Sequence, residues 1–460
     1  MKKLLGLLAV LALTVVASSC GDRGSDSSGG TGGGDTATTA ASGDDGGGGQ
    51  GDWGDLKGVC GPNEKGGAVP DGDDSQGVTE DSITLGTVAD PGFSARPGLN
   101  QEIFDAGDAF VAWCNAAGGI NGKELKLNKH DAKLTDYKPA LDEACGTDFA
   151  MVGGGAVQDN LWESTGKACD LIDVAGFAVT PEKAGLAGQT PDETRTVQPV
   201  PNPGDRYIVA GLKLVDEQYP DALSKTGFLT ADFQTLAAQY SKESQGFEAE
   251  GATEVYKGVY GINGEANWTP FVTAMEKDGA LFQKFIGEGS NAAAFEKARQ
   301  KAGYEPEVRY YETNFYDQAF IDAGGSAVDG ALITSVFIPM EEAADHPATQ
   351  QYLDVMDEQG GKKALLGMQA TSAWLLFATL ARDCDQADDL TRDCILKGAA
   401  GVTDWTGGGL HAATNPGEND PAECQMVMEI KDGKFTRWGP EDEDFSCPEG
   451  AVAEVEPATN

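Results

Sequence analysis

The side chains best suited to binding a small molecule follow the predicted carboxyl ends of strands. Six apolar-rich stretches run into short polar loops, at residues 91–96, 155–160, 180–183, 232–235, 288–291 and 314–316. Open parallel sheets bind ligands beyond the carboxyl ends of their strands. Aromatic walls with a few polar groups suit a small organic ligand. The candidate ligand-binding residues are Phe93, Gln158, Asp159, Thr180, Phe233, Gln234, Glu288, Asn314 and Phe315, with Trp162 as a further wall.

Catalytic chemistry is not indicated by the same sequence. It contains no GxSxG, HExxH or GxxxxGK[ST] motif, and no glycine-rich dinucleotide-binding turn between a predicted strand and helix. An exported hydrolase would need a nucleophile beside a base, and His130, His346 and His411 stand in unpromising contexts. We therefore expect a binding protein that is not an enzyme and has no cofactor.

Nine cysteines are present, and eight remain when Cys20 is set aside. An even set in an exported chain indicates disulfides, although eight cysteines allow 105 connectivities. A metal cluster is the alternative, but there is no CxxC pair and the three histidines are far apart, so no metal site is expected. Sequence proximity favours the pairs Cys60–Cys114, Cys145–Cys169, Cys384–Cys394 and Cys424–Cys447.

The N-terminus is typical of an exported lipoprotein. Lys2 and Lys3 precede an apolar run at 4–16, and small residues lead to Cys20. We interpret residues 1–19 as a signal peptide and Cys20 as the lipidated residue that anchors the chain to the extracytoplasmic face of the cell membrane. A secreted protein with an unmodified Cys20 is the alternative. Residues 20–57 are rich in Gly, Ser, Thr and Asp, which predicts a flexible tether.

Length and charge narrow the function further. The chain has 460 residues and a formal net charge of −41. Roughly 380 residues have globular composition, which is too many for one ordinary core and suits two lobes. Nucleic acid is not expected as a partner, because phosphates bind basic surfaces. The acidity instead favours solubility.

The elements that would position the candidate residues begin with a strand–helix–strand unit. Strands at 83–90 and 124–127 flank a helix at 103–114, whose end is marked by Gly118-Gly119. Such a unit predicts parallel strands with a right-handed crossover. Further helices are predicted at 137–144, 161–171, 207–219, 269–277, 291–302, 350–359 and 369–382. Further strands are predicted at 149–152, 174–179, 227–229, 254–260, 281–286, 308–311 and 331–337, with a closing hairpin at 425–430 and 434–438.

Three passages rich in turn residues, near Val200, Phe337 and Asn415, predict crossovers between two α/β lobes. We expect Rossmann-like lobes with parallel sheets. The N-terminal lobe would comprise 58–200 and 338–414, and the C-terminal lobe 201–337 and 415–439. Residues 440–460 would form a loose acidic tail.

At this point the chain resembles the type I periplasmic binding proteins, in the branched-chain amino-acid-binding family of ABC importers. The resemblance is carried by GVTEDSI at 77–83, FVAWCNAAGGINGK at 110–123 and the pair His130-Asp131. It implies a Venus-flytrap monomer that closes on an amino acid or a related amide or carboxylate. The resemblance further implies delivery of the ligand to permease subunits. A ligand-sensing subunit of a surface receptor would share the fold and is the alternative.

Two departures from the family pattern bear on the ligand. Family members that bind amino acids hold the carboxylate with hydroxyl side chains after the third strand, whereas loop 155–159 has none. They also place a carboxylate where Asn314 is the counterpart by pattern, and a neutral amide cannot form a charge-assisted bond to an ammonium. A branched-chain amino acid is therefore disfavoured unless Asp159 or Glu288 replaces these groups.

Overall fold

The structure is a computed structural model and describes residues 49–63, 67–70 and 72–458. The signal peptide, Cys20 and residues 20–48 of the predicted tether lie outside the described residues. The tether prediction is wrong for 49–57. Trp53 is fully buried, its ring meets Trp113 edge-on at 5.1 Å between centroids, and its backbone pairs with Leu56. A large aromatic side chain in the core fixes this segment, so the folded body starts earlier than the composition suggested.

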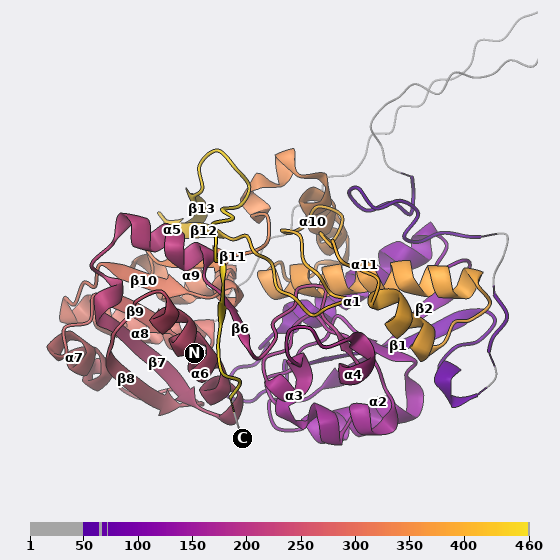
Figure 1. Cartoon of the computed structure of the whole chain (residues 1–460), viewed down its shortest axis with the longest axis horizontal. Helices are drawn as coiled ribbons and strands as arrows, with labels where there is room; N and C mark the ends of the chain where they lie inside the picture. Colours follow the sequence, from indigo (N-terminus) through magenta and orange to yellow (C-terminus); the bar gives the residue numbers. More distant parts are fainter. Residues whose placement is uncertain (1–48, 64–66, 71, 459–460) are drawn as a thin grey trace, which may run out of the picture. The chain divides into compact units, whose positions relative to one another are not determined.

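Two large sheets organise the described residues, beside a third sheet of only two strands, and Figure 1 shows the large sheets with the helices that pack on them. The first sheet is parallel throughout, in the order β2-β1-β3-β4-β5. Its strands are β1 (Ser82–Ala89), β2 (Glu124–Asp131), β3 (Ala150–Val152), β4 (Asp173–Val174) and β5 (Thr196–Val197). This sheet and its helices form the first lobe.

The second sheet has the order β13-β12-β11-β10-β9-β7-β8 and forms the second lobe with its helices. Its parallel strands are β7 (Thr226–Asp232), β8 (Glu254–Gly261), β9 (Phe282–Phe285), β10 (Val308–Tyr311) and β11 (Leu332–Ser335). The predicted hairpin adds β12 (Met426–Lys431) and β13 (Lys434–Gly439), which run antiparallel at the edge. The expected two-lobe α/β fold with mostly parallel sheets is confirmed.

The unit that opens the first lobe forms as its sequence predicts. Helix α1 (Gln101–Ala117) buries Phe110 and Cys114, and it packs against α10 (Pro347–Gln359) and α11 (Leu365–Gln386). Gly118 ends the helix with φ of 112°, a left-handed conformation that glycine adopts without strain. The return of α10 and α11 to α1 shows that the chain re-enters the first lobe after β11.

The remaining helices of the described residues connect successive strands. In the first lobe these are α2 (Tyr137–Thr147), α3 (Pro181–Ala184), α4 (Pro191–Thr194) and α12 (Arg392–Ala399). In the second lobe they are α5 (Ala210–Gln218), α6 (Gln234–Ala249), α7 (Thr269–Lys277), α8 (Gly289–Ala302) and α9 (Gln318–Gly324).

Three predicted elements differ in the structure. Residues 161–171 form no α-helix but short 3₁₀ turns at Asp159–Ser164 and Lys167–Cys169, since Gly166 lies against the buried Trp162 ring and Asp170 is left-handed. The strand predicted at 174–179 ends after Val174. The helix predicted at 207–219 begins only at Ala210, because Arg206–Ile208 form strand β6.

The segment after Pro440 is not the loose tail that its acidity predicted. Strand β14 (Val452–Glu454) pairs antiparallel with β6 and buries Ala453. Ala453 and the following Val455 belong to the core cluster that includes Tyr207 of β6, and burial of these apolar side chains outweighs the acidity of Glu454 between them.

The four predicted disulfides are formed in the structure. Their Cα–Cα separations are 5.3 Å for Cys60–Cys114, 6.0 Å for Cys145–Cys169, 6.0 Å for Cys384–Cys394 and 4.2 Å for Cys424–Cys447.

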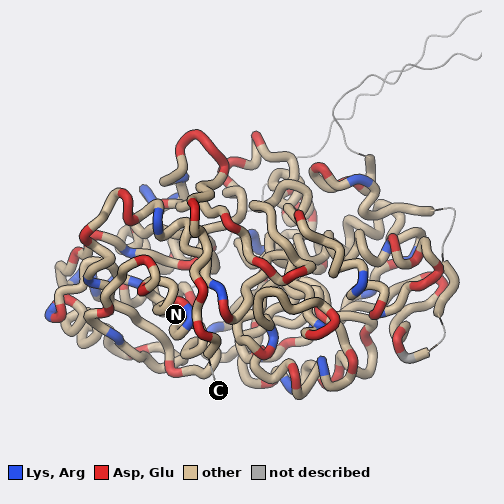
Figure 2. Tube along the Cα trace, viewed as in Figure 1, with Lys and Arg blue, Asp and Glu red and all other residues tan. Residues whose placement is uncertain are grey.

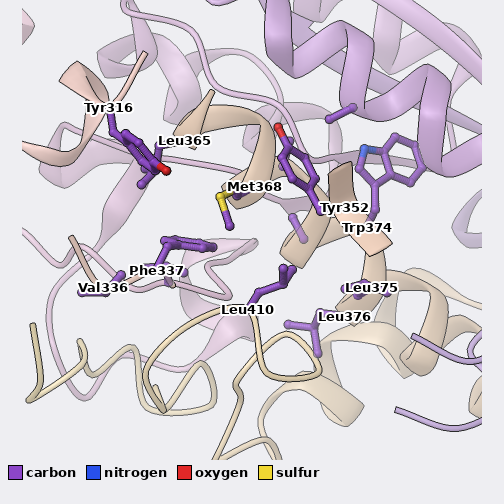
Figure 3. Packing of buried hydrophobic residues seen from close by; sticks show 14 of the residues in the cluster. Tyr316, Val336, Phe337, Tyr352, Leu365, Met368, Trp374, Leu375, Leu376 and Leu410 are labelled. Carbon is purple, nitrogen blue, oxygen red and sulfur yellow. The ribbon is translucent and has the colours of Figure 1, made fainter. Parts of the chain in front are cut away.

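Helix α11 is buried along most of its length. Figure 3 shows Leu365 and Met368 of this helix on the side of Phe337 and Trp374 on the side of Tyr352, and all five are buried. Despite its apolar character, neither α11 nor any other described helix is long and apolar enough to span a membrane. Asp and Glu residues are spread along the whole described trace in Figure 2, so the negative charge is distributed over both lobes.

Candidate ligand-binding site

A cavity of about 250 Å³ lies among the strand-end loops of both lobes, which belong to one compact unit. From the first lobe, the lining residues are Phe93, Leu99, Asn100, Leu134, Val157, Phe177, Ala178, Val179, Leu366 and Gln369. From the second lobe they include Tyr207, Ile208, Thr235, Leu236, Gln239, Lys242, Glu243, Tyr260, Ile262, Glu288, Asn291, Glu312, Thr313, Asn314 and Val336. Val200, Pro201 and Asn202 line it from the first crossover.

The structure brings three of the predicted residues together at this cavity. Phe93 follows β1, Glu288 follows β9 and Asn314 follows β10, so parallel strands carry all three to the lining. The amide of Asn314 donates to the Gly287 carbonyl at 2.9 Å, which fixes its orientation.

The other predicted residues do not line the cavity. The lining contains Val157, Thr235 and Leu236, which are close in sequence to the predicted Gln158, Phe233 and Gln234. Thr180 and Phe315 are buried, and Phe315 packs in the core against Tyr311 at 4.8 Å between centroids. Trp162 is also buried, with its indole N–H donating to the Thr194 carbonyl at 3.2 Å.

Two buried carboxylates hold the first-lobe wall in place. Asp90 accepts backbone N–H bonds from Leu134 at 2.7 Å and Val157 at 2.8 Å. Asp159 accepts one from Val179 at 2.6 Å. Burial raises the pKa of each carboxyl to about 6. Asp159 thus positions the wall and contributes no side chain to the lining.

The second-lobe wall contains a buried ion cluster on Lys284 of β9. Lys284 contacts Glu243 at 3.0 Å and also contacts Glu312, which accepts from the Tyr207 hydroxyl at 2.6 Å. Although burial alone would lower the pKa of Lys284, the two carboxylates raise it above its ordinary value. Lys284 therefore carries a charge that neutralises acidic groups at the cavity.

A second lysine connects the cavity to the first crossover. Lys242 of α6 donates to the carbonyl and the side-chain oxygen of Asn202, at 3.2 and 2.6 Å, and to the Pro203 carbonyl at 2.6 Å. Burial lowers the pKa of this ammonium to about 7. Asn202 in turn donates to the Ala178 carbonyl at 2.8 Å, so α6 is linked through the crossover to the first lobe.

Arg96 bridges the two lobes at the edge of the cavity. From the loop after β1, it donates to Glu288 at 2.7 Å and to the Asn291 side-chain oxygen at 2.5 Å. Glu288 also accepts from the backbone N–H groups of Ser290 and Asn291, which caps α8. A second bridge runs through Lys362, which contacts Glu102 at 2.8 Å and Asp317 at 2.7 Å. These contacts can form only while the lobes face one another.

Sequence reasoning missed several residues at the cavity. Glu312 directly follows β10, so its position at a strand end was the available signal. Lys242 and Gln369 lie within helices, and no strand-end rule could have found them.

A family model described as "Periplasmic binding protein" matches residues 98–434, well over half of the chain. The chain belongs to the periplasmic binding protein family. Members of this family bind small molecules. No curated protein sequence matches the chain.

Solved structures agree that this periplasmic binding protein has the type I fold. One similar structure is a fatty acid ABC transporter substrate-binding protein from Thermomonospora curvata, with TM-score 0.68, 15% identity and coverage of 82% of this chain and 95% of that one. Another is a branched-chain amino acid ABC transporter protein from Thermus thermophilus with bound valine (0.65, 14%, 78% and 95%). A third is an R. palustris solute-binding protein in complex with 4-hydroxybenzoate (0.62, 15%, 80% and 98%).

A serine and a histidine, Ser372 and His411, are in contact outside the cavity lining. Ser372 and His411 are bonded at 2.8 Å, and the Trp405 indole N–H donates to the same hydroxyl at 2.9 Å. Both residues are buried and neither lines the cavity, while burial lowers the pKa of His411 to about 4. This pair therefore has the geometry of a core contact.

No group of three or more His, Cys, Asp and Glu residues within the described ranges could hold a metal ion.

Proposed function

We propose that this periplasmic binding protein captures a small molecule between its lobes and delivers it to the permease of an ABC importer. The observation that carries the proposal is the cavity whose lining comes from strand-end loops of both sheets and from the first crossover. Since neither lobe alone supplies the whole lining, a ligand there favours the closed arrangement over an open one.

For the lobes we propose the boundaries 58–200 with 338–414 and 201–337 with 415–439, and movement about segments near Val200, Phe337 and Asn415. Short segments of this kind can absorb the backbone changes of domain closure. The pairing of β14 with β6 supports adding 451–455 to the second lobe.

Binding can be tested with one variant from each lobe. A ligand found by thermal-shift screening should bind Phe93→Ala and Leu236→Ala about 10-fold or more weakly. Both side chains are half-buried, and truncating an apolar side chain that a ligand covers removes roughly 1 to 3 kcal/mol of contact. Val259→Ala is the control, since Val259 is 51% exposed and does not line the cavity. Small-angle scattering should show contraction on ligand addition. Unchanged affinity in both cavity variants, with the fold intact, would place the ligand elsewhere.

We also propose that residues 1–19 are removed and that Cys20 is lipidated, which holds the protein at the extracytoplasmic face of the membrane as a monomer. The support is the charged and apolar leader before Cys20 and the Gly/Ser-rich stretch after it. Cys20→Ser should shift the protein from the membrane to the soluble fraction. Unchanged partition would contradict anchoring without affecting the binding proposal.

Delivery to an importer has its own test. Deletion of the gene should abolish uptake of the ligand, and genes for permease and ATPase subunits should lie beside it. Normal uptake combined with loss of a response to the ligand would instead favour a sensory subunit.

A further inference from the structure

We infer that the ligand of this cavity is an uncharged molecule that joins an apolar body to a group with both hydrogen-bond donors and acceptors, as a primary amide does. This inference rests on the proposed function, because it assigns the chemical class of ligand to the same cavity. Two independent observations support it: the state of the charged groups in the lining, and the polar atoms there that have no partner.

Every charged side chain of the lining is already engaged by the protein. Lys242 directs its three bonds at backbone and side-chain carbonyl oxygens. Glu243 and Glu312 share the buried Lys284.

Glu288, the remaining charged residue of the lining, binds Arg96 and the start of α8. Around the cavity, three basic side chains (Arg96, Lys242 and Lys284) face three acidic ones (Glu243, Glu288 and Glu312), so their formal charges sum to zero.

This arrangement disfavours binding of both the carboxylate and the ammonium group of an amino acid. A carboxylate ligand needs a cation with free donors, and an ammonium needs a carboxylate with free acceptors. A charged ligand would have to displace one of the existing ion pairs or enter without a partner, and a desolvated charge without a partner is strongly unfavourable. An uncharged ligand requires neither change.

Apart from Glu243 Oε2, which lies 3.0 Å from the Lys284 ammonium, the buried lining atoms without a hydrogen-bond partner among the described residues are neutral, and the Thr313 hydroxyl is one of them. The Thr235 hydroxyl, the Gln369 side-chain carbonyl oxygen and the Asn291 side-chain nitrogen form no hydrogen bond within the part of the chain that the structure describes. The three residues are 0%, 8% and 3% exposed and line the cavity from both lobes. Together they present an acceptor, a donor and a hydroxyl that can be either, which matches a primary amide.

Around these polar atoms the lining is mainly apolar, with Phe93, Phe177, Leu236 and Ile262 among its residues. The volume of about 250 Å³ exceeds the roughly 150 Å³ of an apolar protein cavity that accepts benzene. A single ring or a short branched chain with one polar group therefore fits the space.

The test uses matched probes that share an apolar body. One set is phenylacetamide, phenylacetate and phenylalanine, and a second is 4-methylpentanamide, 4-methylpentanoate and leucine. Purified, ligand-stripped protein is screened by thermal shift, and binders are measured by isothermal titration calorimetry. We expect the amide of a set to bind about 10-fold or more tightly than its charged counterparts, since unpaired buried charges are rejected strongly.

The outcomes separate this inference from the function on which it rests. A carboxylate or amino acid that binds as tightly as its amide, and loses affinity in Phe93→Ala, overturns the uncharged class but leaves the cavity as the binding site. If no probe of either set stabilises the protein, the assigned ligand class is overturned, and the binding function is decided separately by the thermal-shift screen with Phe93→Ala and Leu236→Ala.

A pair of threonine variants supplies the sharper test. Thr235→Val removes the partnerless hydroxyl at nearly constant shape, so the unliganded protein should melt at a higher temperature while the amide binds about 5-fold more weakly. Thr349→Val is the matched control. The Thr349 hydroxyl is also buried near the start of a helix without a partner among the described residues, but it does not line the cavity.

The control should likewise melt at a higher temperature and should retain its affinity for the amide. Unchanged amide affinity in Thr235→Val overturns the assignment of this hydroxyl to the ligand.

Discussion

Replacing Lys284 with methionine tests whether the ion cluster beside the cavity is held by this one cation. Lys284 is fully buried and is shared by Glu243, at 3.0 Å, and by Glu312. Methionine has a similar length but no charge, so the substitution leaves both carboxylates without their cation. The packing of the chain around β9 should otherwise be retained.

The expected loss of unfolding free energy depends on the hydrogen bonds that each carboxylate keeps in the variant. Removing one partner of a buried ion pair costs about 3 to 5 kcal/mol. The Glu312 side chain is 18% exposed and keeps the Tyr207 hydroxyl, while Glu243 keeps the Gln239 amide. Because both retain a donor, we expect a loss near the lower end, about 3 kcal/mol of unfolding free energy at pH 8.

The loss of stability in Lys284→Met should also depend on pH, in a direction set by the carboxyl pKa values. Without the cation, burial leaves the carboxyl pKa values of the folded variant well above those of the unfolded chain. Its stability is then greatest at low pH and is lost as pH rises through the folded pKa. The deficit relative to wild type should therefore shrink between pH 8 and pH 5.

Urea unfolding at both pH values measures the deficit. Lys257→Met is the control. Lys284 lies 5.1 Å from the Tyr310 ring centroid, and Lys257 likewise lies 3.6 Å from the Tyr240 ring centroid but is exposed. The control should change stability by less than about 1 kcal/mol. A deficit for Lys284→Met that is below about 1 kcal/mol at pH 8, or that does not shrink at pH 5, would refute the reasoning.

Other predictions concern closure, pH and covalent stability. Arg96→Ala should raise the ligand Kd about 5-fold by calorimetry, with little change in the melting temperature of the unliganded protein, since a partly exposed bridge contributes about 1 kcal/mol. The pKa of the Asp90 carboxyl is raised from 3.8 to about 6, so wild type should lose up to about 3 kcal/mol of unfolding free energy, relative to Asp90→Asn, as pH rises from 4 to 7. Asp90→Asn cannot titrate at this position, and a difference between the two proteins that does not depend on pH would contradict the prediction. Replacing Cys145 and Cys169 with alanine should lower the unfolding free energy by about 3 kcal/mol in urea.

The fold was largely predictable because local pattern and tertiary packing agree in most elements. The opening unit shows this: the spacing in 103–114, the stop at Gly118 and the following turn all describe the structure that forms. Prediction failed where a distant partner decides the local structure. Arg206–Ile208 continue a helical pattern, but β14, more than 200 residues away, makes them a strand.

The site was predictable only in part, for a related reason. Strand-end logic finds Phe93, Glu288 and Asn314, because parallel topology places such positions at one edge. It cannot tell whether a side chain turns toward the cavity or into the core, as Phe315 does. Nor could it show that Glu312 is neutralised by Lys284, which is separated from it by 28 residues.

The pairing of β14 with β6 affects how the protein should be prepared. β6 carries Tyr207 and Ile208 of the cavity lining, and backbone bonds from Val209 to Ala451 and from Val455 to Asp205 join the same two segments. Residues 441–444, between β13 and β14, are exposed and offer a protease an accessible site. Because Cys447 is bonded to Cys424, a chain cut there keeps β14 attached until that disulfide is reduced. Material that then loses β14 would retain most of its mass and both large sheets, yet would show a falsely weak affinity. An intact mass measured before each titration would detect this, and an affinity tag is better placed at the N-terminal side of the folded body.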